Sequence, residues 1–409
     1  MKVGLVVFAA TYLLIALQRV PLLQLNRPAA ALLGAVAMVV CGGLTLRDAY
    51  AAIDFDVLVF LLGLMLIVGY LEVGRSFEWA AQEMLRRAIT PPRLLAAVVV
   101  GGGVLSALFV NDTVCLVLTP ILLGALGPMR VRPHPYLIGL AMASNVGSVM
   151  SVTGNPQNML VGIWSGTSFG AFLMHMLPVG LGGLAVTYLY LRWAFAAELA
   201  TPFGAALAPV PVTVDRPLVA KGLIMFALAA GAWLAGGSLP LVAITAGAVM
   251  VAIAGRDPAY AIDRVEWSLL LFFASLFVVM RGFEATGAVR WLDAHALALV
   301  GAGSVWRTAV VVSGALTVLS NLISNVPAVI LWRTTVPQLP KADLAWRVVA
   351  MSSTFAGNLV LIGSMANLIV AERAGRRGVR IGFGEYARVG VPVTLLTLTW
   401  GVVVLVLTG

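Results

Sequence analysis

The sequence predicts an all-α polytopic membrane protein that consists of two inverted repeats of five spans each. Hydrophobic residues make up 61% of the 409 residues and charged residues 11%, with a mean hydropathy of +1.01. A soluble domain carries about 25% charged residues. Apolar runs of the length that crosses a bilayer, roughly 17–25 residues, recur along the chain. Polar stretches that contain Asn interrupt these runs at corresponding places in the two halves.

The first repeat is expected to cover residues 1–196. Its run 93–127 is too long for one straight helix and carries a polar motif near its middle, so it predicts a re-entrant hairpin of two short helices. The preceding segment 77–90 mixes charges with Trp79, which is typical of a helix in the membrane interface. The other elements are spans at 3–19, 28–45 and 56–73 (together 3–73), a broken span at 136–166 and a last span at 171–192.

A proline-rich linker at 197–218 precedes the second repeat, residues 219–409, whose elements follow the same order. They are spans at 219–236, 238–255 and 266–283 (together 219–283), an interfacial helix at 287–300, a hairpin at 305–338, a broken span at 346–371 and a last span at 389–408. Four landmarks recur in register: Trp79 and Trp291 are 212 residues apart, Asn111 and Asn325 214, Asn145 and Asn358 213, and Asn158 and Asn367 209. Chance repetition of apolar sequence is the alternative, and four polar or Trp landmarks in one order disfavour it.

The charge pattern predicts the orientation. Five spans per half is an odd number, so the second half must be inverted relative to the first. With both termini outside, 18 of the 26 Lys and Arg residues fall in cytoplasmic loops, as the positive-inside rule requires. We therefore expect a multi-pass protein of the bacterial inner (plasma) membrane, with the lipid bilayer as its partner. The net charge of +9 serves topology, and no nucleic-acid partner is expected.

The polar breaks are the candidate site. Polar sequence at bilayer depth survives where it lines a buried site or a cavity, and two breaks at corresponding positions of two halves indicate the binding site of a secondary transporter. Short neutral donors and acceptors can replace the hydration of an ion or a polyhydroxy solute. The predicted substrate- or ion-binding residues are Asn111, Asp112, Thr113, Asn145, Gly154, Asn155, Asn158, Ser324, Asn325, Asn358, Gly363, Ser364 and Asn367.

Asp112 is singled out because it is the acid that lies in the middle of an apolar run. A carboxylate at that depth is costly, so it should pair with a cation, bind one or take up a proton. We predict that it carries proton coupling. The alternative is a helix cap that accepts hydrogen bonds from backbone N–H groups of the helix that follows.

Gly154, Pro156 and Gly363 are expected to break their spans. Proline removes a backbone donor, and glycine permits the left-handed conformations of an unwound stretch. The carbonyl groups freed there are candidate cation ligands. A simple proline kink is the alternative for Pro156, and the matching break at Gly363 disfavours it.

Other classes of protein fit less well. There is no Gly-x-x-x-x-Gly-Lys-Ser/Thr sequence, so the chain has no ATP-driven engine of its own. Clustered His, Cys or paired carboxylates at depth, which an enzyme would need, are missing, and a channel would need a continuous polar lining. Neither catalytic residues nor metal ligands nor a cofactor are predicted. Cys41 and Cys115 lie too far apart in the sequence to indicate a disulfide framework.

At these motifs the chain resembles the ion transporter superfamily, which includes arsenite permeases, divalent-anion/sodium symporters and citrate transporters. Phe109-Val110-Asn111-Asp112 with Leu118-Thr119-Pro120-Ile121 is similar to the first hairpin of the arsenite permeases. Ser144-Asn145-Val146-Gly147, Gly154-Asn155-Pro156-Gln157-Asn158, Ser324-Asn325-Val326-Pro327 and Gly363-Ser364-Met365-Ala366-Asn367 resemble a bacterial anion-permease branch. The resemblance covers nearly the whole chain. It implies a scaffold domain from the first three spans of each half, a transport domain with both hairpins, and elevator-type alternating access.

The substrate expected from these motifs is arsenite or antimonite, exported in exchange for protons. The dicarboxylate symporters carry Ser-Asn-Thr at both tips, whereas this chain has Asn-Asp-Thr and Ser-Asn-Val. No Arg or Lys was found at depth to neutralise a dianion, and Asp112 would repel one. Sodium- or proton-coupled symport of small organic or inorganic anions, such as a dicarboxylate or citrate, is the alternative. A homodimer, and in the arsenite branch a separate soluble ATPase, are the protein partners that the resemblance suggests.

Overall fold

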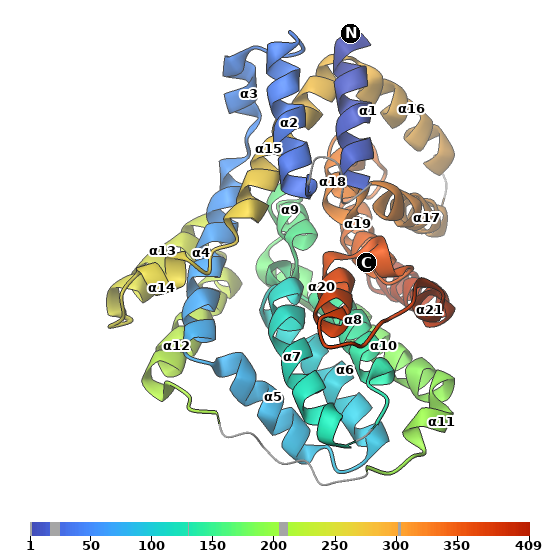
Figure 1. The fold of residues 1–409 in the computed structure, drawn as a ribbon. Helices are drawn as coiled ribbons and strands as arrows, with labels where there is room; N and C mark the ends of the chain where they lie inside the picture. Colours follow the sequence, from blue (N-terminus) through green and yellow to red (C-terminus); the bar gives the residue numbers. More distant parts are fainter. Residues whose placement is uncertain (1, 17–24, 130, 204–211, 302–303) are drawn as a thin grey trace.

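The computed structural model describes residues 2–16, 25–129, 131–203, 212–301 and 304–409, and the described residues form helices and connecting segments without a strand (Figure 1). The helices of the first half are α1 (Lys2–Ala16), α2 (Arg27–Val40), α3 (Leu46–Ala52), α4 (Phe55–Val73), α5 (Ser76–Arg87), α6 (Pro91–Leu108), α7 (Asn111–Met129), α8 (His134–Ser148), the 3-10 helix η1 (Val152–Gly154), α9 (Pro156–Trp164), α10 (Phe169–Ala194) and α11 (Ala196–Leu199).

The helices of the second half begin at Arg216. They are α12 (Arg216–Leu234), α13 (Leu239–Ile253), α14 (Ala259–Ile262), α15 (Trp267–Ala285), α16 (Ala288–Val300), α17 (Val305–Ile323), α18 (Asn325–Leu331), η2 (Val336–Gln338), α19 (Ala342–Ala356), η3 (Leu361–Gly363), α20 (Met365–Gly375) and α21 (Phe383–Thr408).

Helix length and composition bear out the predicted class. Among the described residues, 7 helices are long and apolar enough to cross a membrane, and 4 shorter apolar helices accompany them. The chain is therefore an all-α, multi-pass membrane protein. One of the shorter apolar helices, Asn111–Gly127 within α7, starts at the first polar motif. The orientation of the termini and the inversion of the repeats stay predictions.

Helix starts follow local sequence signals. Asp54, Thr90 and Ser168 accept a hydrogen bond from the backbone N–H three residues later and so cap α4, α6 and α10. Proline follows the cap at the first position of α6 and α9, where its missing N–H costs nothing.

Three pairs of helices that the sequence register places in correspondence have equal lengths. α4 and α15 each have 19 residues, α8 and α19 each have 15, and α10 and α21 each have 26. Pro178 inside α10 and Pro392 inside α21 occupy the same place in their helices. The 3-10 helices η1 and η3 each have 3 residues and begin 209 residues apart, at Val152 and Leu361. These matches support the repeat that the sequence register predicts.

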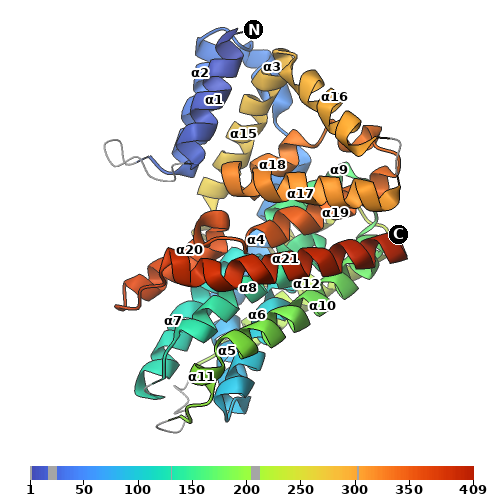
Figure 2. The same cartoon turned by 90° about the vertical axis from the view of Figure 1, so that its right-hand side faces the viewer.

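Two groups of helices surround the centre of the molecule. α4 packs against α13 and α15 against α2, whereas α6 packs against α8, α17 against α19 and α10 against α21. Figure 1 shows α2, α4 and α13, with α12 and α14, to the left of the group that contains α6, α8, α10 and α17–α21, and in Figure 2, turned by 90°, α10 and α21 lie in front of α4 and α12. Two contacts bring backbones together. A Cβ atom on Gly147 would lie 2.1 Å from the Gly103 carbonyl oxygen, and one on Gly63 would lie 2.3 Å from the Ala243 carbonyl carbon.

Asp215 marks the start of the second half. α11 (Ala196–Leu199) overlaps the start of the predicted linker 197–218, α12 begins within the linker, and residues 204–211 lie outside the described residues. The Asp215 carboxylate accepts hydrogen bonds from Arg256 and from the backbone N–H of Leu218, at 2.5 and 3.3 Å. The bond from Arg256, more than the backbone bond, holds the pKa of Asp215 below its ordinary value.

We expect Asp215→Asn to destabilise the protein only where the carboxylate is ionised. The folded pKa is depressed, so the charge stabilises the fold above the unfolded pKa of about 3.9 and ceases to do so as the pH falls through the folded value. Because the pair is largely solvated, the expected loss near pH 7 is about 0.2–1 kcal/mol. Asn still caps α12, so thermal unfolding of both proteins in detergent should converge at acid pH. An equal difference in thermal stability between the two proteins near pH 7 and at acid pH would contradict this role of the Asp215 charge.

Candidate functional site

Each broken helix is held open by one Asn side chain. Between α8 and α9, the Asn158 Nδ2 donates to the carbonyl oxygens of Ser148 at 3.0 Å, Val149 at 3.3 Å and Ser151 at 2.9 Å. Between α19 and α20, the Asn367 Nδ2 donates to the carbonyl oxygens of Gly357 and Val360, at 2.7 and 3.3 Å. A break frees carbonyl groups that need a partner in an apolar interior, and the amide supplies it. The carbonyl groups expected as cation ligands are thus already bonded to an amide.

The residues that cap the helices after the breaks also form hydrogen bonds to the other half. Asn155 caps α9 by accepting from the backbone N–H of Asn158 at 2.8 Å, and its Nδ2 donates to Thr354 Oγ1 on α19 at 3.2 Å. Ser364 caps α20, and its Oγ donates to Asn145 Oδ1 on α8 at 2.9 Å. Residues 155 and 364 are 209 apart, as are 145 and 354. The cap of each half is therefore bonded to the other half in the same way.

Asn145 is the centre of the network. It is 1% exposed. Its Oδ1 accepts from Asn111 Nδ2 at 3.0 Å and from Ser364 Oγ, and its Nδ2 donates to Asn358 Oδ1 at 2.8 Å and to Asn367 Oδ1 at 3.1 Å. One amide thus joins the tip of the first hairpin, its own broken helix and the broken helix of the second half.

The hydrogen bonds correct one predicted equivalence. The sequence register makes Asn358 the equivalent of Asn145, but the residue that occupies the equivalent position in the other half is Thr354. Thr354 Oγ1 donates to Asn158 Oδ1 at 3.5 Å, as Asn145 donates to Asn367. The register was drawn through residues of one type, whereas a hydroxyl group can occupy the same place as an amide.

The glycines at the breaks serve close packing. A Cβ atom on Gly154 would lie 2.2 Å from the Ser148 carbonyl oxygen, and one on Gly363 would lie 2.9 Å from Asn321 Oδ1. Neither residue has a positive φ, so the left-handed conformation expected there is wrong. The constraint is space, since any side chain would push the two ends of the break apart.

The first hairpin tip lies where α6 ends and α7 begins. Asn111 is buried and bonded to Asn145, whereas Asp112 and Thr113 are half-buried and have no side-chain hydrogen bond with another described residue. The charge of Asp112 is attracted by Arg27 and repelled by Glu266. The cap alternative for Asp112 has no support from a hydrogen bond among the described residues. The structure thus leaves Asp112 and Thr113 outside the amide network.

The second tip is in contact with Arg27, a residue that the sequence does not place near the motifs. Ser324 has φ 79°, and its Oγ accepts from Arg27 Nη1 at 3.5 Å. Arg27 is one of the 18 Lys and Arg residues that the charge pattern assigns to cytoplasmic loops, and the sequence predicts no deep cation near the motifs. It is instead the first residue of α2 and reaches the tip from another part of the chain. The only sequence signal was its place before Pro28 at the start of an apolar run, which also suits a topogenic loop charge.

A small polar cavity lies at this tip. It has a volume of about 20 Å³ and is lined by Arg27, Ser320, Asn321 and Ser324 with neighbouring apolar residues. Ser320 Oγ, Asn321 Oδ1 and Asn325 Oδ1 are buried without a hydrogen-bond partner among the described residues. Buried polar atoms of this kind call for a partner, and the cavity is the size that one water or one ligand oxygen needs.

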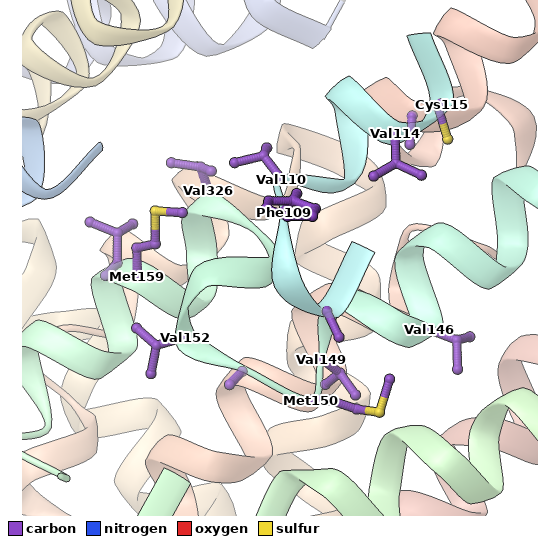
Figure 3. Packing of buried hydrophobic residues seen from close by; sticks show 14 of the residues in the cluster. Phe109, Val110, Val114, Cys115, Val146, Val149, Met150, Val152, Met159 and Val326 are labelled. Atoms are coloured by element: carbon purple, nitrogen blue, oxygen red, sulfur yellow. The ribbon is translucent and has the colours of Figure 1, made fainter. Parts of the chain in front are cut away.

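Apolar side chains enclose the polar network. Figure 3 shows Phe109 and Val110 of the first tip and Val326 of the second within one buried cluster that includes Val149 and Met159 at the break. Cys115 belongs to this cluster, and its Sγ is bonded to Ser144 Oγ at 3.1 Å. The described residues contain no group of three His, Cys, Asp or Glu that could hold a metal ion.

Comparison with known proteins agrees with this architecture. The citrate transporter family model matches residues 12–352. An uncharacterized transporter, Rv2684 of Mycobacterium tuberculosis, is 31% identical over 424 residues, which cover 97% of this chain and 96% of that protein. The silicon efflux transporter LSI3 of Oryza sativa subsp. japonica is 30% identical, and the match covers 98% of this chain and 96% of that protein. The putative transporter arsB of Dictyostelium discoideum is 22% identical, and the match covers 95% of this chain and 88% of that protein.

A solved structure has the same fold. The crystal structure of the YdaH transporter of Alcanivorax borkumensis superposes with a TM-score of 0.60 at 17% sequence identity and covers 99% of this chain and 96% of that one. The predicted superfamily resemblance is confirmed by the family match over residues 12–352. The chain therefore belongs to the citrate transporter family of the ion transporter superfamily and is a secondary transporter.

Proposed function

We propose that the protein exports a small neutral hydroxide, arsenous or antimonous acid, in exchange for protons. The buried amide and hydroxyl network around Asn145 carries this proposal. Each hydroxyl group of such a solute both donates and accepts hydrogen bonds, as do the amides of Asn111 and Asn358 and the hydroxyl of Ser364. A neutral solute enters an apolar site without the desolvation cost of a charge. The name of one relative, a silicon efflux transporter, supports export as the direction of transport.

Asp112 would carry the proton in this scheme. It lies at the first tip beside the network, and Arg27 attracts its ionised form. Protonation removes that attraction, and the hydrogen bond to Ser324 is then the Arg27 side-chain contact that remains among the described residues. The charge state of Asp112 thus changes the forces between α2 and both tips, and this is what a coupling residue must do.

Symport of a small anion is the second candidate, and Arg27 favours it. A guanidinium group beside Ser324 and Asn321 can bind a carboxylate through charge-assisted hydrogen bonds. The family match is to citrate transporters. The two candidates differ in whether Arg27 contacts the cargo.

Flux into everted membrane vesicles separates the candidates. With a respiration-driven proton gradient, vesicles that contain the protein should accumulate arsenite and antimonite, and a protonophore should abolish the accumulation. Vesicles without the protein are the control, and radiolabelled citrate and succinate are measured in parallel with and without sodium. Unchanged metalloid flux together with sodium-dependent citrate or succinate uptake would replace the proposal with the second candidate.

Arg27→Gln gives a second, independent result. If the cargo is a neutral hydroxide, downhill arsenite flux should keep its apparent KM within a few-fold. If the cargo is an anion bound by the guanidinium, losing a hydrogen bond to a charged group, about 1.5–3 kcal/mol, should raise the KM for the anion by roughly 10–150-fold. The exposed Arg47→Gln is the matched control, and it should change neither flux.

A further inference from the structure

Asp54 joins three parts of the molecule. It precedes α4, and its Oδ2 accepts from Trp164 Nε1, at the end of α9, at 2.8 Å. The same oxygen lies 3.8 Å from Nη2 of Arg333, which follows α18, and the Arg333 guanidinium lies 4.6 Å from the centre of the Trp164 ring. The Asp54 side chain is 15% exposed. One carboxylate therefore holds α4 to the first broken helix and to the second hairpin.

The second half has residues of opposite charge at the corresponding positions of its helices. Glu266 precedes α15 as Asp54 precedes α4, and both helices have 19 residues. Trp164 is the ninth residue of α9, and the ninth residue of α20 is Arg373. Glu266 is exposed, and among the described residues neither Glu266 nor Arg373 forms an ion pair within contact distance. α4 packs against α9, whereas α15 and α20 have no comparable packing among the described residues.

We propose that Asp54 and Glu266 are alternating docking carboxylates. Asp54 holds Trp164 and Arg333 in the conformation seen here, and Glu266 holds Arg373 in the opposite one. A secondary transporter exposes its site to one side at a time, and in a protein of two related halves the two conformations exchange the roles of the halves. The closed junction of one half and the open junction of the other are what a single such conformation presents.

A second junction would balance the free energies of the two conformations. A transporter must populate both conformations, so their free energies differ by only a few kcal/mol. Leaving the present conformation breaks a hydrogen bond to an ionised carboxylate, which is worth about 1.5–3 kcal/mol, and separates Asp54 from a cation. An ion pair between Glu266 and Arg373 would offset this loss. The inference rests on secondary transport by the chain and on the predicted inversion of its repeats, and it is independent of the cargo.

Cysteine cross-linking in membranes tests the proposal without a transport substrate. In a Cys41→Ser background with the buried Cys115 kept, Asp54→Cys with Trp164→Cys should cross-link with a short bifunctional methanethiosulfonate. Glu266→Cys with Arg373→Cys should cross-link too. The rate of this second reaction should fall when residues 54 and 164 are replaced by a pair that holds α4 to α9 more tightly. Arg376→Cys in place of Arg373→Cys is the matched control and should react more slowly. No reaction of the Glu266–Arg373 pair, or a rate equal to the Arg376 control, would overturn the proposal.

A charge exchange supplies a functional readout. Glu266→Arg and Arg373→Glu should each lower the transport rate by about tenfold, and the double variant should recover most of it, because the ion pair is restored in reverse. Arg376→Glu, whose partner is Glu372, should not be rescued by Glu266→Arg. Membrane abundance and thermal stability identify a variant that fails to fold. Additive losses in the double variant at normal abundance would refute the pairing, and they would leave the cargo proposal untouched.

Discussion

Asn145→Ala is expected to abolish transport and to lower thermal stability more than any other single substitution in the polar network. The change removes four hydrogen bonds and leaves groups of Asn111, Asn358, Ser364 and Asn367 without that partner in a buried site. Hydrogen bonds between membrane helices average about 0.6 kcal/mol and buried groups left without a partner cost more, so the expected loss is about 2–4 kcal/mol. Thermal unfolding in detergent and vesicle flux measure the two effects.

Thr399→Val is the matched control for this variant. Thr399 donates to the Leu395 carbonyl oxygen on an exposed part of α21 at 2.8 Å, and its removal leaves no buried group without a partner. It should change neither stability nor flux. A folded Asn145→Ala protein that transports at the wild-type rate would show that the network plays no part in the cycle.

Asp112→Asn should abolish uphill, proton-driven transport and retain part of the downhill exchange. The amide keeps the size and the hydrogen-bonding capacity of the side chain but cannot titrate. The substitution removes the charge that attracts Arg27, so the response to a proton gradient should disappear. The binding of a neutral cargo should change little, because the cargo carries no charge that the carboxylate could attract or repel. Accumulation against a gradient and exchange without a gradient, measured in the same vesicles, separate these effects.

Asn111→Ala is the comparison for Asp112→Asn. It deletes a neutral ligand that is bonded to Asn145, so it should weaken both uphill transport and exchange. Wild-type rate and wild-type pH dependence in Asp112→Asn would show that Asp112 has no coupling role and would leave the helix-cap alternative for it.

The predictable part of this protein is carried by composition and by spacing. Long apolar runs and a charged fraction of 11% identify a multi-pass helical protein, because a soluble domain carries about 25% charged residues. Spacing also led to Asn158 and Asn367, which recur 209 residues apart and have the same role in their two breaks. The division into scaffold and transport domains, the inversion and the elevator motion stay predictions.

The parts that sequence reasoning missed depend on tertiary contacts. Thr354 was overlooked because its equivalence to Asn145 is a matter of hydrogen bonds and not of residue type. Arg27 was counted as a loop charge because nothing local to it reveals that Ser324, 297 residues away, is its partner. Space at Gly154 and Gly363 is likewise a property of two segments, whereas the sequence shows one segment at a time.

The reciprocal caps at Asn155 and Ser364 constrain how the two halves can diverge. Each cap is bonded to a side chain encoded in the other half, Asn155 to Thr354 and Ser364 to Asn145. After a gene duplication, a substitution in one copy is therefore tolerated only with a complementary residue in the other. Asn–Thr at one crossing and Asn–Ser at the other are two solutions of the same constraint. Related sequences should show coordinated substitution between positions 155 and 354 and between 145 and 364, with each pair free to drift from the other.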